Sequence, residues 1–129
     1  MQAAVSHLQA AKVAIIPTDT VYGIGALASD AHAVAQVLAA KGRGRQMPPP
    51  VLVSDISQLD GVVANIPTPA RALMEAYWPG ALTLILPAHP DLSWDLGETG
   101  GTVAVRQPNY PLTLQLLSQT GPLAVTSAN

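Results

Sequence analysis

Short apolar runs alternate along the chain with segments whose apolar residues recur every three or four positions. The runs are typical of buried strands, which we predict at residues 13–16, 51–53, 81–86, 102–106 and 123–126. The periodic segments predict amphipathic helices at residues 5–11, 31–41, 56–63, 70–77 and 111–118. Because helices and strands mostly alternate, we predict one α/β domain over residues 1–129, with a mixed sheet and flanking helices.

Local signals mark the ends of two of these helices. Asp30 is suited to cap the N-terminus of the helix at 31–41, and Gly42 can end that helix in the left-handed conformation. Thr68 followed by Pro69 predicts an N-cap and a first helical residue for the fourth helix.

Residues 16–25 break the pattern. This stretch, Ile-Pro-Thr-Asp-Thr-Val-Tyr-Gly-Ile-Gly, combines hydroxyls, a carboxylate and two glycines after an apolar run. We interpret it as a turn-rich loop at the end of a strand, where Gly23 and Gly25 allow unusual backbone conformations or a close approach to a ligand. An ordinary loop, in which Thr and Asp side chains stabilise local turns, explains the same residues. A second long loop is predicted at 87–101.

Composition narrows the class of protein. Of 129 residues, 49% are apolar and 11% are charged, which indicates a globular chain. No apolar run reaches the roughly 18 residues of a membrane span, so no membrane association is expected. Cysteine is absent, which excludes disulfides and thiolate chemistry, and we expect a cytoplasmic location. The net charge of -2 argues against a surface that binds nucleic acid over its whole extent.

Several common sites are missing from the sequence. It has no phosphate-binding P-loop, no complete dinucleotide-binding glycine pattern and no Gly-x-Ser-x-Gly motif. The three histidines are scattered without metal-ligand spacing, so we predict no metal site built from protein side chains. Any catalysis should therefore depend on positioning and electrostatics.

Positive charge is concentrated in one segment. Three of the six Lys and Arg residues, Lys41, Arg43 and Arg45, fall within five positions. Polar side chains also lie at the ends of several predicted strands. If those strands run in the same direction, the two sets meet at one edge of the sheet and suit an anionic ligand such as phosphate. The alternative is a solvated charge cluster at a helix C-terminus.

Five short motifs occur in order along the chain. They are Pro17–Gly23, Lys41–Arg43, Tyr77–Thr83, Val103–Arg106 and Ser127–Asn129. Together they resemble the YrdC-type threonylcarbamoyl-AMP synthases, in particular the actinobacterial members, over about residues 13–129. Each motif alone is weak, whereas the ordered set is specific. The resemblance implies a twisted open α/β sheet with a positively charged concave face.

The resemblance also implies an activity. Such a nucleotidyltransferase joins L-threonine, bicarbonate and ATP into threonylcarbamoyl-AMP and releases pyrophosphate, for the threonylcarbamoyladenosine modification of tRNA. Mg²⁺ is expected with the ATP, and other proteins of that tRNA modification are expected partners. By resemblance, the residues that hold the phosphates and act in catalysis are Lys41 and Arg43. The ATP-binding residues would be Lys41, Arg43, Thr102, Ser127 and Asn129. The threonine-binding residues would be Thr20, Arg106 and Thr126.

The chain departs from the family pattern in several places. Gly44 replaces the usual Pro after the Lys-x-Arg motif, which loosens that loop. Leu52 stands where some members use a His to contact threonine. Because members usually continue past the Ser-x-Asn motif, we expect the domain to be incomplete after Asn129, with weak or absent activity.

Two other functions are compatible with these features. One is an RNA-binding module, in which the cations of residues 41–45 contact phosphates without chemistry. The other is a carbamoyl-transfer domain of a larger enzyme with the same fold. The synthase hypothesis makes a geometric demand, because Arg43 and Asn129 must face each other across a single hollow.

Overall fold

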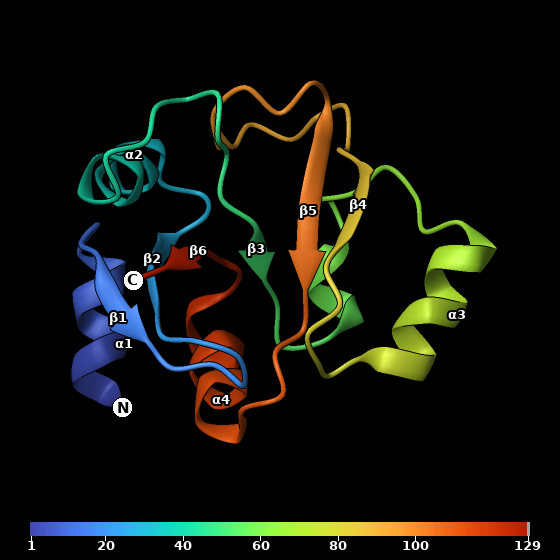
Figure 1. Ribbon diagram of the computed structural model, residues 1–129, viewed down its shortest axis with the longest axis horizontal. Helices are drawn as coiled ribbons and strands as arrows, with labels where there is room; N and C mark the ends of the chain where they lie inside the picture. The colour runs from blue at the N-terminus through green and yellow to red at the C-terminus, as the bar shows by residue number, and fades with distance from the viewer. Residues whose placement is uncertain (129) are drawn as a thin grey trace.

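A mixed sheet forms the centre of the fold (Figure 1). The computed structural model describes residues 1–128. Over those residues the sheet has six strands in the order β1-β2-β6-β3-β5-β4. The strands are β1 Ala14–Ile16, β2 Gly23–Leu27, β3 Val51–Leu52, β4 Leu84–Pro87, β5 Thr102–Arg106 and β6 Leu123–Ser127. Strands β3 and β5 pair in parallel, and the other neighbours are antiparallel. The predicted α/β fold with a mixed sheet is confirmed.

Helices flank the sheet on both sides (Figure 1). They are α1 Gln2–Gln9, α2 Ala31–Ala40, α3 Thr68–Tyr77, α4 Pro111–Thr120 and the short 3₁₀ helix η1 Ile56–Leu59. Within residues 1–128, none of the helices is long and apolar enough to cross a membrane.

Each face of the sheet has its own core, because successive side chains of a strand point to opposite faces. On one face Leu52, Leu123 and Val125 pack with apolar residues of α1 and α4. On the other face Val51 and Val105 pack with residues of α2, η1 and α3. Burying each such aliphatic side chain contributes about 1.5–3 kcal/mol.

The first face is covered only in part. Arg106 is paired with Leu52 and therefore shares its face, as do Ala104 and Thr102 at two-residue steps along β5. Ile85 of β4 pairs with Ala104, and 70% of its surface is exposed. The side of β4 and β5 that carries these residues is thus open, and Arg106 at its end lines the site described below.

Strand β2 was not predicted, since residues 16–25 were interpreted as a loop. The structure pairs Gly23 with Ser127 and Gly25 with Val125 along β6. A Cβ on Gly23 would lie 2.3 Å from Val125 Cγ1, and one on Gly25 would lie 2.7 Å from Val125 Cγ2. Glycine is therefore required here for close packing of two strands rather than for a turn. The loop between β1 and β2 is limited to residues 17–22.

Other element ends differ in smaller ways. Asp30 caps α2 as predicted, since its Oδ1 accepts a hydrogen bond from the Ala33 N–H at 3.0 Å, and Gly42 adopts a φ of 67°. Thr68 is the first helical residue of α3 rather than its N-cap, which is Pro67. The helix predicted at 56–63 is shortened to η1, because the chain turns at Gly61 with a φ of 79°. Strand β4 starts three residues later than the prediction at 81–86.

Candidate functional site

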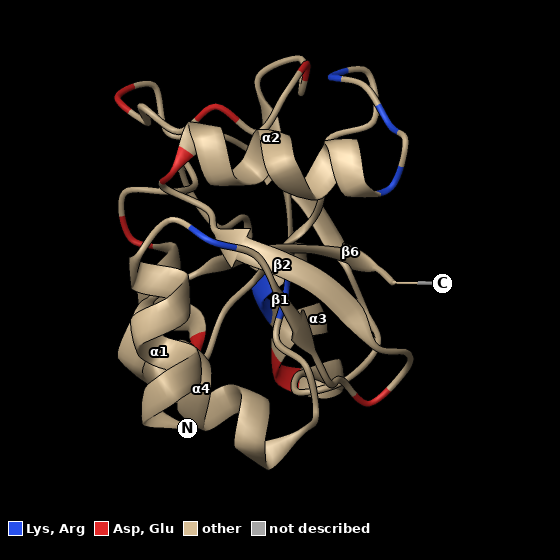
Figure 2. Cartoon of the chain, turned by 90° about the vertical axis from the view of Figure 1, so that its left-hand side faces the viewer, with Lys and Arg blue, Asp and Glu red and all other residues tan. Residues whose placement is uncertain are grey.

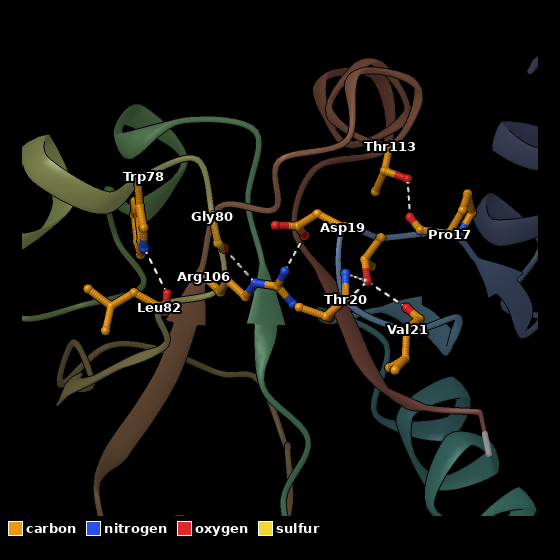
Figure 3. Close-up of polar contacts among 10 residues, drawn as sticks. Pro17, Asp19, Thr20, Val21, Trp78, Gly80, Leu82, Arg106 and Thr113 are labelled. Atoms are coloured by element: carbon orange, nitrogen blue, oxygen red, sulfur yellow. Dashed lines mark hydrogen bonds and ion pairs between the residues drawn. The ribbon is translucent and has the colours of Figure 1, made fainter.

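Arg106, the last residue of β5, is held on three sides (Figure 3). Its Nε donates a hydrogen bond to the carbonyl oxygen of Gly80 at 2.8 Å. Its Nη1 donates to Thr20 Oγ1 at 3.3 Å, and its Nη2 forms an ion pair with Asp19. The side chains of Arg106 and Asp19 are only 11% and 19% exposed. The guanidinium is therefore fixed in one orientation by groups that come from two other segments.

The loop at 17–22 reaches Arg106 because both of its ends are anchored. Thr113 of α4 donates a hydrogen bond from its Oγ1 to the carbonyl oxygen of Pro17 (Figure 3). At the other end, the Ala128 N–H donates to the carbonyl oxygen of Tyr22 at 2.8 Å. Within the loop, Thr18 Oγ1 donates to the Val21 carbonyl oxygen. These bonds satisfy backbone groups that a short connection would otherwise leave unpaired.

Arg43 joins the positively charged segment to the end of β6. Figure 2 shows blue segments gathered in the loop that follows α2. There the Arg43 N–H donates to the Leu38 carbonyl oxygen at 2.8 Å, which continues the end of the helix. The Arg43 side chain donates from Nη1 to Thr126 Oγ1 at 3.1 Å. Thr126 is buried, with 6% of its surface exposed. A cation and a hydroxyl that are 83 positions apart in sequence thus lie in contact.

Thr20, Arg106 and Thr126 line one hollow of about 140 Å³, which Arg43 borders through its hydrogen bond to Thr126. Its polar lining includes four of the predicted site residues, and the complete lining is Thr18, Thr20, Val21, Gly23, Pro50, Leu52, Thr83, Arg106, Val125, Thr126 and Ser127. Leu52 makes part of this lining apolar. The hollow offers hydroxyls and one guanidinium to a small polar ligand.

Thr102 does not line this hollow. It lies four residues before Arg106 on the same face of β5, which is about 13 Å along a strand. Thr102 instead lines two further hollows, one of about 180 Å³ with Pro48, Pro49 and Ile85, and one of about 290 Å³ with Trp94. The open side of β5 is thus followed by a row of hollows, with Arg106 at one end and Thr102 at the other.

The sequence predicts that the polar groups meet at one edge of the sheet if their strands run in the same direction. Strand β5 does not meet this condition. Strand β3 is antiparallel to β6 and parallel to β5, so β5 and β6 run in opposite directions. Arg106 and Ser127 would lie at different edges on strand direction alone. They line the same hollow because the loop at 17–22 extends to Arg106 and closes the space between them.

The remaining predicted residues are placed as follows. Lys41 is the half-buried residue that ends α2, two positions before Arg43. Asn129 lies outside the described residues, so its place opposite Arg43 stays a prediction. Within residues 1–128, no three His, Asp or Glu side chains are grouped so that they could hold a metal ion.

Asp19 and Arg45 make contacts that the sequence does not predict. From sequence, Asp19 is interpreted as a turn-stabilising carboxylate, with a general base as the less common alternative, and Arg45 as one cation of the positively charged segment. Arg45 instead forms a forked ion pair with Asp95, with both N–O distances at 2.9 Å. Hydrogen bonding from Arg45, and secondarily from the Gly97 N–H, holds the pKa of the Asp95 carboxyl below its usual value. No signal in the sequence near Arg106 points to Asp19, which lies 87 positions away.

The chain is similar in sequence to known proteins along almost its whole length. The model of the family Sua5_yciO_yrdC, described as telomere recombination, matches residues 6–129. The chain belongs to the Sua5/YciO/YrdC family. It is 51% identical over 126 residues to a putative threonylcarbamoyl-AMP synthase of Mycobacterium tuberculosis, with 98% of the chain and 58% of that relative covered. It is 45% identical over 128 residues to the threonylcarbamoyl-AMP synthase of Bacillus subtilis, covering 98% of the chain and 37% of the relative.

A solved structure of this family has the same fold. The crystal structure of Pyrococcus abyssi Sua5 complexed with L-threonine superimposes with a TM-score of 0.93 at 36% identity. The match covers 99% of the chain and 38% of Sua5. The chain thus spans about 58% or less of the length of these family members. The relatives favour neither an RNA-binding module nor a carbamoyl-transfer domain as the function.

Proposed function

We propose that this chain carries the substrate-binding face of a threonylcarbamoyl-AMP synthase. The reaction would join L-threonine, bicarbonate and ATP and release pyrophosphate. The observation that carries the proposal is the single hollow in which Thr20, Arg106 and Ser127 meet, with Arg43 hydrogen-bonded to a fourth lining residue, Thr126. The threonylcarbamoyl-AMP synthases among its relatives support the same assignment.

The two ends of the site would bind different substrates. Arg106 would pair with the carboxylate of threonine, while Thr20 and Thr126 would hydrogen-bond its polar groups. Arg43 and Lys41 would hold the phosphates of ATP, where Arg supplies a planar fork and Lys a point charge. Arg43 gives one Nη1 N–H to Thr126, and the other N–H groups of its guanidinium fork are of the kind that bind phosphate oxygens. Ser127, Asn129 and Thr102 would complete the nucleotide side.

The chemistry needs positive charge more than a strong base. The threonine amine would add to the carbon of CO₂ with loss of a proton, or react with bicarbonate with loss of water, and form a carbamate. A carbamate oxygen would then attack the α-phosphorus of ATP. The bond to pyrophosphate would break in line with that attack. Because both reactants are anionic, the cations would lower the barrier by holding them in contact and by stabilising the charge on the leaving group.

Mg²⁺ would arrive with the nucleotide. No group of three His, Asp or Glu side chains suited to a metal occurs in the described part of the chain. Phosphate oxygens and water would therefore supply its ligands, and we assign no step to the ion. A cytoplasmic location, other tRNA-modification proteins as partners and direct RNA binding stay predictions.

Binding measurements test the proposal directly. ATP and L-threonine should each bind in calorimetric titrations, and each should bind more tightly in the presence of the other, because they would share one site. Incubation with ATP, L-threonine and bicarbonate should release pyrophosphate and form an adenylate of the expected mass in a chain that continues past Asn129, and at most weakly in this one. A folded chain that binds neither ligand, or a continued chain that forms no product, contradicts the assignment.

Replacing Arg43 by Ala should weaken ATP binding and leave the affinity for threonine alone nearly unchanged. A charged contact of this kind contributes about 1.5–3 kcal/mol, which corresponds to an increase in Kd of about 10- to 150-fold. Arg71→Ala is the matched control, since Arg71 is exposed on α3. Equal ATP affinity in the Arg43 and Arg71 variants would remove Arg43 from the phosphate site.

A further inference from the structure

Two loops that are distant in sequence are joined at the edge of the row of hollows. We name residues 41–47 the cation loop and residues 88–101 the long loop. Arg45 of the cation loop forms the forked ion pair with Asp95 of the long loop, 50 positions away. The carbonyl oxygen of Arg45 also accepts a hydrogen bond from the Glu98 N–H at 2.7 Å. Both a side chain and the backbone of Arg45 therefore hold the two loops together.

The close approach depends on Gly97. This residue has a φ of 108°, and a Cβ placed on it would lie 2.7 Å from the Arg45 carbonyl oxygen. Any larger residue at this position would push the cation loop away from the long loop. The contact is thus built into the local conformation of both segments and does not depend on the ion pair alone.

The joined loops form the walls of a hollow. Pro48 and Pro49 follow directly after the cation loop, and Leu96 and Thr99 belong to the long loop. All four line the hollow of about 180 Å³ that also contains Thr102. Moving one loop relative to the other would therefore change the width of that hollow.

The start of the cation loop is held by the end of α2, because the Gly42 and Arg43 N–H groups donate to the carbonyl oxygens of Ala39 and Leu38 at 3.0 and 2.8 Å. The part of the loop after Arg43 is packed more loosely. A Cβ on Gly42 would meet no heavy atom within 4 Å, and a Cβ on Gly44 would meet only the flexible side chain of Gln46. Arg43 lies between these two glycines, which allow many backbone conformations. The contacts that hold the residues on either side of Arg43 therefore restrict its backbone.

We propose that the Arg45–Asp95 pair is a latch that positions Arg43 toward the anionic ligand. This inference rests on the proposed function, in which that ligand is ATP. The latch would keep the cation loop against the long loop and would not itself touch the phosphates. Arg45 and Asp95 are thus positioning residues.

The physical role of such a latch is to shift a local equilibrium. The two side chains are 60% and 45% exposed, so their pair adds little to the stability of the whole domain. If the loop is held closed for only a fraction of the time, the apparent Kd for the ligand rises by the inverse of that fraction. Loss of the latch should therefore weaken ATP binding by about two- to fivefold without lowering the melting temperature.

The test uses single variants and a charge swap. Asp95→Asn and Arg45→Gln should each raise the Kd for ATP by about two- to fivefold and leave the Kd for L-threonine unchanged. Both should also speed hydrogen exchange at the Glu98 amide. The double variant Arg45→Asp with Asp95→Arg should recover most of the ATP affinity and of the amide protection. Asp91→Asn, an exposed charge change in the long loop, is the matched control.

Three outcomes would overturn the latch. One is unchanged exchange at Glu98 and unchanged ATP affinity in both single variants. Another is a charge-swapped protein that behaves no better than the single variants. The third is an effect of Arg45→Gln that is as large in the Asp95→Asn background as in the native chain, because Arg45 would then act on the phosphate directly. If the native chain does not bind ATP, the proposed function fails, and exchange at Glu98 still decides whether the pair holds the loop.

Discussion

The ion pair between Arg106 and Asp19 offers the sharpest test of how this site is built. Replacing Asp19 by Ala would leave the guanidinium with its bonds to Gly80 and Thr20 but without a counter-charge. Asp19→Asn would keep a neutral acceptor in the same place. Neither change alters a predicted ligand-contacting residue, so both act through the orientation of Arg106.

The expected magnitude lies between two limits. Exposed ion pairs contribute about 0–1 kcal/mol, and removing one partner of a fully buried pair costs about 3–5 kcal/mol. The side chains are 11% and 19% exposed, whereas the Asp19 residue as a whole is exposed, so the pair lies between these limits. Two retained hydrogen bonds and access to water reduce the cost, so we expect Asp19→Ala to destabilise the fold by about 2 kcal/mol. Asp19→Asn should cost about half as much.

Thermal unfolding followed by circular dichroism is the assay. For a chain of this size, 1 kcal/mol shifts the melting temperature by about 3–5 °C, so Asp19→Ala should lower it by about 6–10 °C. Calorimetric titration should show threonine affinity falling by about tenfold in the same variant, if misorientation costs ~1.4 kcal/mol at the carboxylate. Glu75→Ala, which removes an exposed carboxylate on α3, is the control. Charged contacts of this kind usually contribute ~2 kcal/mol to stability. A melting temperature within about 1 °C of the native value would therefore show that the pair does not support the site.

Two further predictions concern the sheet and the latch. Gly23→Ala should destabilise the fold by about 1–3 kcal/mol in urea unfolding, because its Cβ would meet Val125 and the chain would have to shift; Gly44→Ala, which would meet only a flexible side chain, should cost less. The latch should also depend on pH. Because Arg45 keeps the folded pKa of Asp95 below the ordinary value, the pair is fully formed above the unfolded pKa and is lost as pH falls through the lowered one. Protection of the Glu98 amide from hydrogen exchange should therefore persist at neutral pH and fall only in acid, below the ordinary Asp pKa of ~3.9. Loss of protection already near neutral pH would show that the Asp95 carboxylate does not control it.

Most of the local structure follows from short-range patterns in the amino-acid sequence. The strands at 13–16, 51–53, 102–106 and 123–126 and the cap at Asp30 follow from signals within a few residues of each position. Such signals reflect the preferences of the backbone and the need to bury one side of each element, and both act locally. The ordered motifs likewise indicated the family, and eight candidate site residues were named, of which four line one hollow.

Tertiary structure alone decided which of these groups meet. Gly23 and Gly25 carry no local signal that separates a turn from a strand packed closely on β6, so β2 was missed. The direction of β5 depends on its pairing with β3, which no stretch of sequence near Arg106 encodes. The partner of Arg106 lies 87 positions away, and that of Arg45 lies 50 away. Contacts between distant segments are set by how whole elements pack, because only packing determines which faces and edges approach one another.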